Sequence, residues 1–574
     1  MLAVSYMMEG QDGAGYYTSS SELRIIQHIF DVMAENWSFT WFAHNAQYEF
    51  RYFIDLLLDH RDHVKFFLRT DSDVFMLVID LPDYGEKVSI TLRDSFAIWD
   101  LSLKQITATF CPDLPKMELD LESVIFNPND AYHIEYAKRD SHALLLSLVR
   151  FNDLVRETFD VNIHATRAGT ALAAWQRTLK RGERYYNNKE DEDFIRTAYY
   201  GGLVFLTSTL LHADPKTYDI NSSYPYQMLS HLMPMGKSVR IKRISRIKMG
   251  IYRVTVMAPD NLIVPILPKR DKKGIVWPRG TFETTVTNRE IEFALKQGYR
   301  LLEVHEGRIW NEECQPFLEF ISKCVAIRQS QESGSTLDWT AKYMQNSLYG
   351  KFGAKRRRRK IYASVSEDQM EGVSFWGDFF IKEEYADDMQ CLPQWSVFIT
   401  AHARLHLLRT IYAVGPANVL YGDTDSITVK SGVQIDTGKH YGQWKLEKTW
   451  QDFKAHGPKV YAGHLMDGAI KGAAKGIPRR TWERSGIFDA ILNCEDDKVV
   501  RYQTLEKFVV ALKTRYIGER DATRSLSSLG HSRSWHELSD GSVRPRYWHE
   551  IEARERPALQ EPAEAGIRKR GGIA

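Results

Sequence analysis

The sequence feature that most constrains the fold is an acidic turn between two β-prone runs. Residues 419–423 and 426–429 hold mostly β-branched, aliphatic and aromatic side chains, and Gly422-Asp423-Thr424-Asp425 lies where the runs meet. Such runs joined by a few turn-forming residues favour an antiparallel hairpin. Asp423 and Asp425 would lie close together at its tip, and close carboxylates repel each other unless a cation lies between them. The segment predicts a β-sheet with a cation site at this tip, although a merely polar turn explains the same residues.

A second acidic residue follows another strand-like run. Asp219 belongs to Tyr218-Asp219-Ile220-Asn221-Ser222-Ser223-Tyr224-Pro225, in which serine and proline indicate a turn into a helix. A single aspartate at a strand end is most often a turn or helix-capping residue. Asp219 therefore indicates chemistry only in combination with the other segments.

The third informative segment is a predicted helix face. In residues 342–350, helical geometry places Lys342, Asn346 and Tyr349 one turn apart on one side. A cation, an amide and an aromatic ring in one stripe could hold a triphosphate and stack on a base, while a solvated amphipathic helix is the alternative. With the acidic residues, this face points to phosphoryl transfer from a nucleoside triphosphate. In that chemistry carboxylates hold two Mg²⁺ ions, replaceable by Mn²⁺, and a lysine neutralises the triphosphate.

The composition excludes several classes of protein. Lys and Arg number 76 against 74 Asp and Glu, so the net charge of +2 excludes a uniformly basic DNA-coating protein. The five cysteines include no CxxC pair, which argues against a zinc ribbon or iron–sulfur cluster and is typical of free thiols in a reducing compartment. No apolar run reaches the roughly 18–20 residues of a membrane span. We expect a cytoplasmic monomer without a membrane partner, in which residues 1–8 form a strand and not a signal peptide.

Taken together, the motifs resemble those of a known family. DINSSYP at 219–225, KYMQNSLYG at 342–350 and YGDTDS at 421–426 resemble motifs A, B and C of family B DNA polymerases, in the same order. NSLYGKF, Tyr199-Tyr200-Gly201-Gly202 and Lys459-Val460-Tyr461 are similar to motifs of the protein-primed branch of small phages and linear plasmids. The resemblance implies an α/β and α+β multidomain fold. A ribonuclease H-like 3′–5′ exonuclease domain would precede a right-hand polymerase with palm, fingers and thumb.

The resemblance also implies domain boundaries. We expect an exonuclease-like domain at residues 1–188, a polymerase domain at 189–530 and a polar, flexible tail at 531–574. Within the polymerase domain the expected parts are a palm (about 189–256 and 393–450), fingers (about 313–353), a thumb (about 451–530) and two insertions (about 257–312 and 354–392). In this branch the insertions grip a priming protein and close a ring around DNA.

Residues at the polymerase site receive roles from the same resemblance. Asp219 and Asp423 would be the metal ligands, with Asp425 beside them as a third catalytic carboxylate. Tyr224 would lie under the sugar of the incoming nucleotide and reject a 2′-hydroxyl group, which favours dNTP substrates. The other nucleotide-binding residues would be Lys342 and Arg328 at the triphosphate and Asn346 and Tyr349 at the nascent base pair.

Two further motifs would contact primer–template DNA. Tyr199, Gly201 and Gly202 would meet the template strand, because glycine permits close backbone approach to a phosphate. Lys459 and Tyr461 would stabilise the primer strand.

The second insertion contains an unbroken basic run at 355–360. It begins with Lys355, Arg356 and Arg357 and could neutralise several phosphates or be a solvated loop. The resemblance implies as partners primer–template DNA, dNTPs and, for initiation in viral or mobile-element replication, a terminal protein whose hydroxyl group acts as the primer.

The exonuclease motifs of the N-terminal domain are incomplete. The second motif resembles residues 42–49, with Asn45, Tyr48 and Glu49, and the third resembles 136–140, with Tyr136 and Asp140; Lys104 is an auxiliary candidate. Glu49 stands where the family has aspartate, and the family spacing puts the missing first motif, Asp-x-Glu, before Met1. Either the true start lies upstream or proofreading has been lost. We expect little exonuclease activity and a scaffold role along the template path.

The sequence is also compatible with other functions. The nearest alternative is a family B polymerase that extends only nucleic-acid primers. Two others come from different classes: a metal-dependent 3′–5′ exonuclease whose second half only clamps DNA, and a non-catalytic DNA-binding module. The joint presence of Asp219, Asp423, Lys342 and Tyr224 argues against both.

Overall fold

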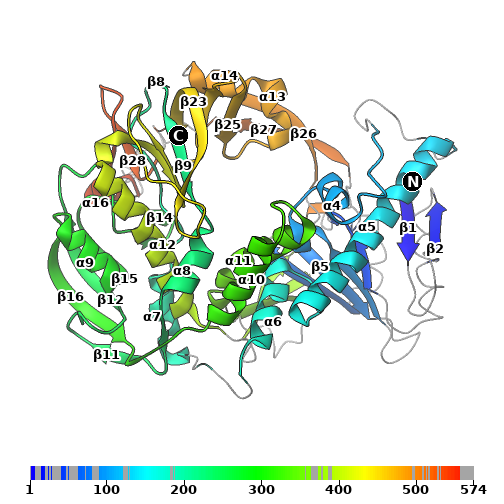
Figure 1. Ribbon diagram of the computed structural model, residues 1–574, viewed down its shortest axis with the longest axis horizontal. Coiled ribbons are helices and arrows are strands. Elements are labelled where there is room, and N and C mark those ends of the chain that lie inside the picture. The colour runs from blue at the N-terminus through cyan, green and yellow to red at the C-terminus, as the bar shows by residue number, and fades with distance from the viewer. Residues whose placement is uncertain are drawn as a thin grey trace, which may run out of the picture.

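The structure is a computed structural model of the 574-residue chain. It describes residues 2–6, 15–19, 40–46, 63–70, 73–80, 89–119, 129–180, 188–355, 357–362, 373–376, 379–385, 391–493, 498–506, 518–526 and 532–555, with a few single residues between these segments. Within them, two long helices lie between the N-terminal domain and a large sheet (Figure 1).

The N-terminal domain is a four-stranded sheet covered by helices. Its strands lie in the order β3 (Thr40–Ala43), β6 (Ser89–Asp94), β5 (Asp73–Asp80) and β4 (Val64–Thr70), with β3 and β6 parallel and the other pairs antiparallel. The helices are α3 (Phe96–Trp99), α4 (Leu103–Phe110), α5 (Ala131–Phe159) and α6 (Arg167–Arg177). A separate pair, β1 (Leu2–Tyr6) and β2 (Gly15–Ser19), confirms the strand expected at the start.

Aromatic packing fixes the fingers against this domain. The stretch expected as the fingers, about 313–353, holds α10 (Leu318–Ser330) and α11 (Thr336–Phe352), and α11 contains the helix predicted at 342–350. Trp339 of α11 lies 5.6 Å from Phe110, and Tyr343 lies 6.2 Å from Phe151, measured between ring centroids. These rings share one buried cluster, so the N-terminal domain supports the helix that carries the predicted nucleotide-binding face.

The palm is a sheet that carries the acidic turn. Its strand order is β25-β24-β23-β9-β22-β21-β7, with β8 (His212–Ala213) beside β23. The bounds are β7 (Val204–Leu206), β9 (Lys216–Ile220), β21 (Val419–Asp423), β22 (Ser426–Val429), β23 (Trp444–Gly457), β24 (Val460–Leu465) and β25 (Ile470–Ala474). α8 (Ser223–Ser230) and α12 (Pro393–Val414) pack against each other beside it. The antiparallel pairing of β21 with β22 confirms the predicted hairpin.

A second antiparallel sheet continues the palm into the first insertion. Its order is β11 (Val239–Ile241), β16 (Arg300–Ile309), β12 (Gly250–Ala258) and β15 (Gly280–Thr287). The border expected at 256–257 is wrong, because it falls inside β12. Side chains of this sheet and of the palm, such as Val254 and Ile427, share one core, so the chain has no domain break there. Other elements nearby are α7 (Glu192–Thr197), β10 (Met233–Met235), β13 (Lys269–Asp271), β14 (Gly274–Val276), α9 (Asn288–Lys296) and β17 (Glu312–Cys314).

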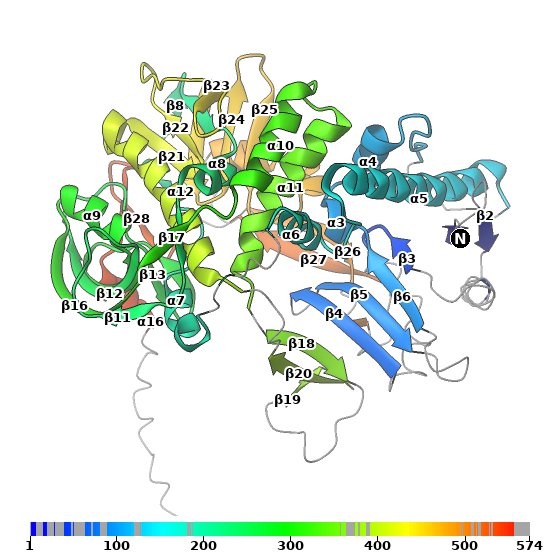
Figure 2. The same cartoon turned by 60° about the horizontal axis from the view of Figure 1, so that its bottom comes forward.

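The second insertion and the thumb are smaller units. In the insertion, β18 (Arg357–Tyr362), β20 (Phe379–Tyr385) and β19 (Val373–Trp376) form an antiparallel sheet, and β18 lies beside β4 of the N-terminal domain (Figure 2). The segment expected as the thumb contains α13 (Trp482–Ser485), α14 (Ile487–Leu492), β26 (Val499–Leu505) and β27 (Glu519–Ser525), and Ile487 and Val500 share a core with Val460 of β24. The border expected at 450–451 is wrong, because it falls inside β23. Among the described residues, 3₁₀ turns include Lys189–Asp191, Pro416–Asn418 and Arg479–Thr481.

The flexible tail expected at 531–574 is wrong for residues 532–555. They form β28 (Trp535–Glu537), β29 (Val543–Pro545) and α16 (Trp548–Glu555). Trp535 and Val543 are 2% and 0% exposed and belong to the palm core. The backbone N–H of Val543 donates to Thr207 O at 2.8 Å. A segment with few apolar residues packs because the palm already offers the core into which they insert. Residues 556–574 lie outside the described part of the chain.

Candidate active site

Backbone pairing holds the acidic turn against β9. Asp219 of β9 lies opposite Ser426 of β22, which is itself paired with Asp423 across the hairpin. The N–H of Ile220 donates to the carbonyl of Asp425 at 2.9 Å. The sheet thus gathers at one end the three aspartates that the sequence singled out in two separate segments.

Each predicted metal-ligand carboxylate faces a lysine. Lys459 Nζ lies 2.9 and 2.8 Å from Oδ1 and Oδ2 of Asp423, and Lys445 Nζ lies 2.8 Å from Oδ1 of Asp219. Burial, followed by the charges of Asp219 and Asp423, raises the pKa of Asp425 to about 7. The two neighbouring charges add to the effect of burial because close carboxylates repel each other.

The donor set fits a divalent cation that substrate phosphates help to bind. Among the described residues, no three His, Cys, Asp or Glu side chains form a complete metal site by themselves. Mg²⁺ is usually bound by one or two carboxylates together with substrate phosphates, and not by a cage made only of protein. Asp219 and Asp423 supply such oxygen ligands, provided that Lys445 and Lys459 move away from them.

The predicted nucleotide-binding residues meet at the junction of α8 and α11. Tyr224, in the first turn of α8, stacks on Tyr349 of α11 with ring centroids 4.2 Å apart and an angle of 8° between the planes. Lys342 and Asn346 of α11 are exposed. The structure therefore joins the turn after Asp219 to the predicted helix face through one aromatic pair.

Arg328 connects the two fingers helices to the palm. Its guanidinium donates to Asp338 at 2.8 Å, to Ser222 Oγ at 3.1 Å and to the hydroxyl of Tyr441 at 3.0 Å. The Tyr441 hydroxyl in turn donates to Gln345 of α11 at 2.9 Å. Arg328 is engaged with protein groups here, so its role at the triphosphate stays a prediction. Sequence reasoning missed Tyr441, which lies in a loop without a motif.

The glycines after Tyr199 differ in what surrounds them. A Cβ atom on Gly202 would lie 2.5 Å from Thr424 Oγ1, so glycine is required there by close packing on the acidic turn. The expected approach of Gly202 to a template phosphate stays a prediction. Gly201 has open space around its Cα. Arg404 holds this segment by donating to Gly201 O at 2.9 Å.

A groove of about 400 Å³ runs beside the carboxylates on the β23–β24 side. Asp423, Asp425, Lys448, Lys459 and Tyr461 are among the residues that line it. Burial and then the charge of Asp423 raise the pKa of Tyr461, so its phenol stays neutral. The structure thus brings the predicted primer-strand residues to the acidic site.

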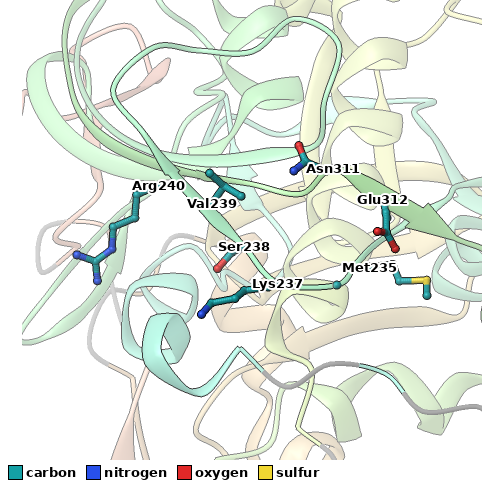
Figure 3. A pocket seen from close by; sticks show the side chains of 8 residues that line it. Met235, Lys237, Ser238, Val239, Arg240, Asn311 and Glu312 are labelled. Atoms are coloured by element: carbon teal, nitrogen blue, oxygen red, sulfur yellow. The ribbon is translucent and has the colours of Figure 1, made fainter.

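A second hollow, of about 510 Å³, lies between the β10–β11 connection and residues 311–312 (Figure 3). Lys237, Ser238, Arg240 and Glu312 are among its lining side chains. Its charges are mixed, and none of the predicted site residues reaches it.

In the exonuclease-like region, a lysine contacts both residues of the third motif. Lys116 forms an ion pair with Asp140 and lies 5.0 Å from the centroid of the Tyr136 ring. Burial raises the pKa of Asp140 even though Lys116 opposes this shift. Lys104 pairs instead with exposed Glu118, at 2.6 Å, so the auxiliary lysine expected from sequence is not the one that contacts Asp140.

The second exonuclease motif is described only in part. The N–H of Asn45 donates to Asp94 Oδ1 at 2.9 Å, and Asp94 is a buried acid that sequence reasoning missed. Tyr48 and Glu49 lie outside the described residues.

Of the basic run, the structure describes Lys355, which is exposed, and the backbone of β18 from Arg357 onward; Arg356 lies outside the described residues. DNA binding by this run stays a prediction. No helix in the described segments combines the length and apolar character needed to cross a membrane.

Comparisons with known proteins agree with the resemblance to family B DNA polymerases. Residues 130–430 match the family model described as DNA polymerase type B, organellar and viral. The chain is 28% identical over 369 residues to a probable DNA polymerase of Neurospora intermedia, covering 58% of this chain and 38% of that protein. It is 26% identical over 347 residues to a probable DNA polymerase of Agaricus bitorquis, covering 50% and 43%. The chain thus spans less than half the length of these two fungal relatives.

A phage relative and a solved structure cover more of the chain. The DNA polymerase of Streptococcus phage Cp-1 is 24% identical over 477 residues, or 75% of this chain and 79% of that one. The Phi29 DNA polymerase complexed with primer–template DNA and incoming nucleotides matches with a TM-score of 0.71 at 18% identity, covering 90% and 94% of the two chains. This likeness confirms the expected fold: an exonuclease-like domain ahead of a right-hand polymerase.

Proposed function

The chain belongs to the type B DNA polymerases of organellar and viral kind, and from this premise we propose that it is a template-directed DNA polymerase that adds dNTPs to a primer. One observation carries the proposal. Asp219 and Asp423 lie at one end of the palm sheet, and Tyr224, which follows Asp219, stacks on the helix face that presents Lys342.

In the proposed reaction the 3′-oxygen of the primer forms a bond to the α-phosphorus of the dNTP, and pyrophosphate leaves. Asp219 and Asp423 would hold two Mg²⁺ ions, which supply positive charge at the reacting phosphate when bound. Lys342 would neutralise the triphosphate, and its exposure in α11 supports this role. Asp425, with its raised pKa, would support the two metal-binding carboxylates.

The aromatic pair Tyr224–Tyr349 would form the floor of the nucleotide site. A ring under the sugar occupies the space that a 2′-hydroxyl group would need, and the stack on Tyr349 keeps the Tyr224 ring in place. The proposed selectivity for dNTPs over rNTPs therefore depends on a rigid ring, not on a hydrogen bond.

The proposed DNA path follows the groove beside the carboxylates. Lys459 and Tyr461 line it and would face the primer strand once Lys459 is released from Asp423. Gly201, with open space around it, would approach the template. The solved relative described as complexed with primer–template DNA supports this choice of substrate.

For initiation we propose a terminal protein whose hydroxyl group replaces the primer 3′-hydroxyl. The support is motif resemblance to the protein-primed branch in residues 199–202, 346–352 and 459–461. The alternative is extension of nucleic-acid primers only. Transfer of a labelled nucleotide to a purified candidate protein, in the absence of any oligonucleotide, would separate the two.

Proofreading is proposed to be weak. Lys116 forms an ion pair with the carboxylate of Asp140, and the described residues contain no group of three or more His, Cys, Asp or Glu side chains that could hold a metal ion. Digestion of a 3′-labelled single strand that disappears in an Asp140→Asn variant would contradict this.

The test of the main proposal is primer extension on a gel. A 5′-labelled primer on a longer template is incubated with Mg²⁺, with and without dNTPs, and should lengthen only when dNTPs are present. Asp423→Asn should slow extension by about 10³-fold or more, because charge stabilisation by the metal amounts to several kcal/mol. The matched control is Asp467→Asn, an exposed turn aspartate, which should extend normally. Shortening without extension would favour the nuclease alternative.

A further inference from the structure

Two lysines contact the proposed metal ligands, and only one of them lies in a recognised motif. Lys459 belongs to the Lys-x-Tyr motif and reaches Asp423 from the turn between β23 and β24. Lys445 belongs to no motif. It lies on β23 directly opposite Asp219 in the strand register, with its Nζ 2.8 Å from Oδ1.

We propose that Lys445 is a built-in counter-ion of Asp219 that competes with the divalent metal and thereby sets the metal concentration at which the site fills. The inference rests on the proposed polymerase function and goes beyond it, because it concerns how readily the site is loaded and not which reaction it performs.

The register makes the contact between Lys445 and Asp219 a fixed feature of the sheet. Their Cα atoms are neighbours across the paired strands β9 and β23, so Lys445 cannot leave Asp219 by a loop movement. The side chain itself can leave, because it is 49% exposed and a lysine stem is flexible. Lys445 therefore returns to Asp219 whenever no other cation is bound.

The ammonium and a metal ion compete for one carboxylate. Lys445 contacts Oδ1 of Asp219, one of the two oxygens that the proposed metal would use. Metal binding therefore either displaces the ammonium from Oδ1 or brings a divalent charge of the same sign close to it. Both effects oppose metal binding. An exposed ion pair is weak, and like charges a few ångströms apart add a similar repulsion, so we expect a shift of metal affinity of about three- to tenfold.

The same geometry predicts an opposite effect without metal. The strand register brings Asp219 and Asp423 to either side of Ser426, so their carboxylates repel each other when no metal is bound. Lys445 relieves part of that repulsion. Its loss should lower the melting temperature in EDTA while making the increase caused by metal larger.

The experiment compares Lys445→Met with Lys448→Met. Methionine keeps the apolar stem and removes the charge. Lys448 lies on the same strand as Lys445 and lines the groove beside Asp423, but it pairs with Glu447 at 3.1 Å and not with a proposed ligand, so its variant controls for loss of a nearby positive charge. Lys445→Arg keeps the charge and should behave like the unmodified chain.

Metal binding is measured in two ways that do not require catalysis. Free Mn²⁺ is followed by electron paramagnetic resonance in the complex of the full chain with a dideoxy-terminated primer–template and dNTP. Melting temperatures of the chain alone are recorded in EDTA and in millimolar Mn²⁺. The Mn²⁺ binding that is lost in Asp423→Asn is the part that belongs to this site.

The proposal is supported if Lys445→Met binds Mn²⁺ about three- to tenfold more tightly than the Lys448→Met control and has a lower melting temperature only in EDTA. Equal affinities in the two variants overturn it, and so does a melting temperature that falls equally with and without Mn²⁺, because that pattern indicates a merely structural role. If the unmodified chain shows no Mn²⁺ binding that depends on Asp423, the proposed function fails together with the inference; equal affinities with Asp423-dependent binding intact refute the inference alone.

Discussion

Replacing Arg404 by methionine tests how the core of the palm holds residues 200–202, the segment that packs against the acidic turn. The side chains of Arg404 and Glu290 are each 1% exposed, and Arg404 Nη2 lies 2.7 Å from Glu290 Oε1. Arg404 Nη1 donates to the carbonyls of Tyr200 at 2.7 Å and Gly201 at 2.9 Å. Without the guanidinium, a buried carboxylate loses its cation and two carbonyls lose a donor.

The expected loss of stability follows from the burial of this ion pair. Removing one partner of a buried ion pair destabilises a protein by about 3–5 kcal/mol, because the remaining charge is left uncompensated. Arg404→Met should therefore lower the free energy of unfolding by about 4 kcal/mol. Adding Glu290→Gln should recover about 1–2 kcal/mol, because an unpartnered amide costs less than an unpaired charge. The other oxygen of Glu290 accepts from Thr287 in a helix cap, which glutamine can retain.

The assay is urea unfolding followed by tryptophan fluorescence, with midpoint and slope compared between variants. The matched control is Arg253→Met. Arg253 pairs with Glu306 at 2.7 Å in the adjoining sheet, but the two side chains are 46% and 32% exposed, so the loss should stay below about 1 kcal/mol. A loss for Arg404→Met no larger than that of the control, or a double variant as unstable as the single one, would refute the reasoning.

Three further predictions concern other parts of the chain. Tyr224→Val should reduce the preference for dNTP over rNTP, as a ratio of kcat/KM, by about 10²-fold; an unchanged ratio would exclude the ring as the gate. Burial lowers the pKa of His44 to about 4, so its imidazole stays neutral when folded, and stability should fall by at most about 3 kcal/mol as the pH drops from about 6.5 to 4. The melting temperature should depend less on pH across that range in His44→Gln than in the unmodified chain, and an equal dependence would contradict this. A chain ending at residue 531 loses Trp535 from the palm core and should melt lower by several degrees than one ending at 555, whereas equal melting would show that this segment adds no stability.

Local patterns predicted the parts of the site that lie within single segments. The hairpin around Asp423 follows from two β-prone runs and a turn, and the face with Lys342 follows from helical spacing; the structure has both elements. Both depend only on residues a few positions apart, for which propensity and periodicity are informative.

The errors have equally physical causes. The predicted border between palm and first insertion at about 257 was wrong because both segments share one core. The prediction of a flexible tail was wrong because Trp535 and Val543 insert into a core built by other segments, which the hydrophobicity of the tail itself does not reveal. Lys116 was overlooked in favour of Lys104 because no spacing rule relates a lysine in one segment to Asp140 on α5.

The sequence by itself determined the acidic hairpin, the helix with the lysine and tyrosine face, and the order of the motifs that identifies the family. Only the tertiary structure decided which cation opposes each carboxylate, that Tyr224 stacks on Tyr349, and that Gly202 packs against Thr424. These contacts depend on the register between strands and on helix packing across distant segments. A chain's local periodicity does not encode that register, because many alignments of two strands satisfy the same alternation and only the packed core selects one.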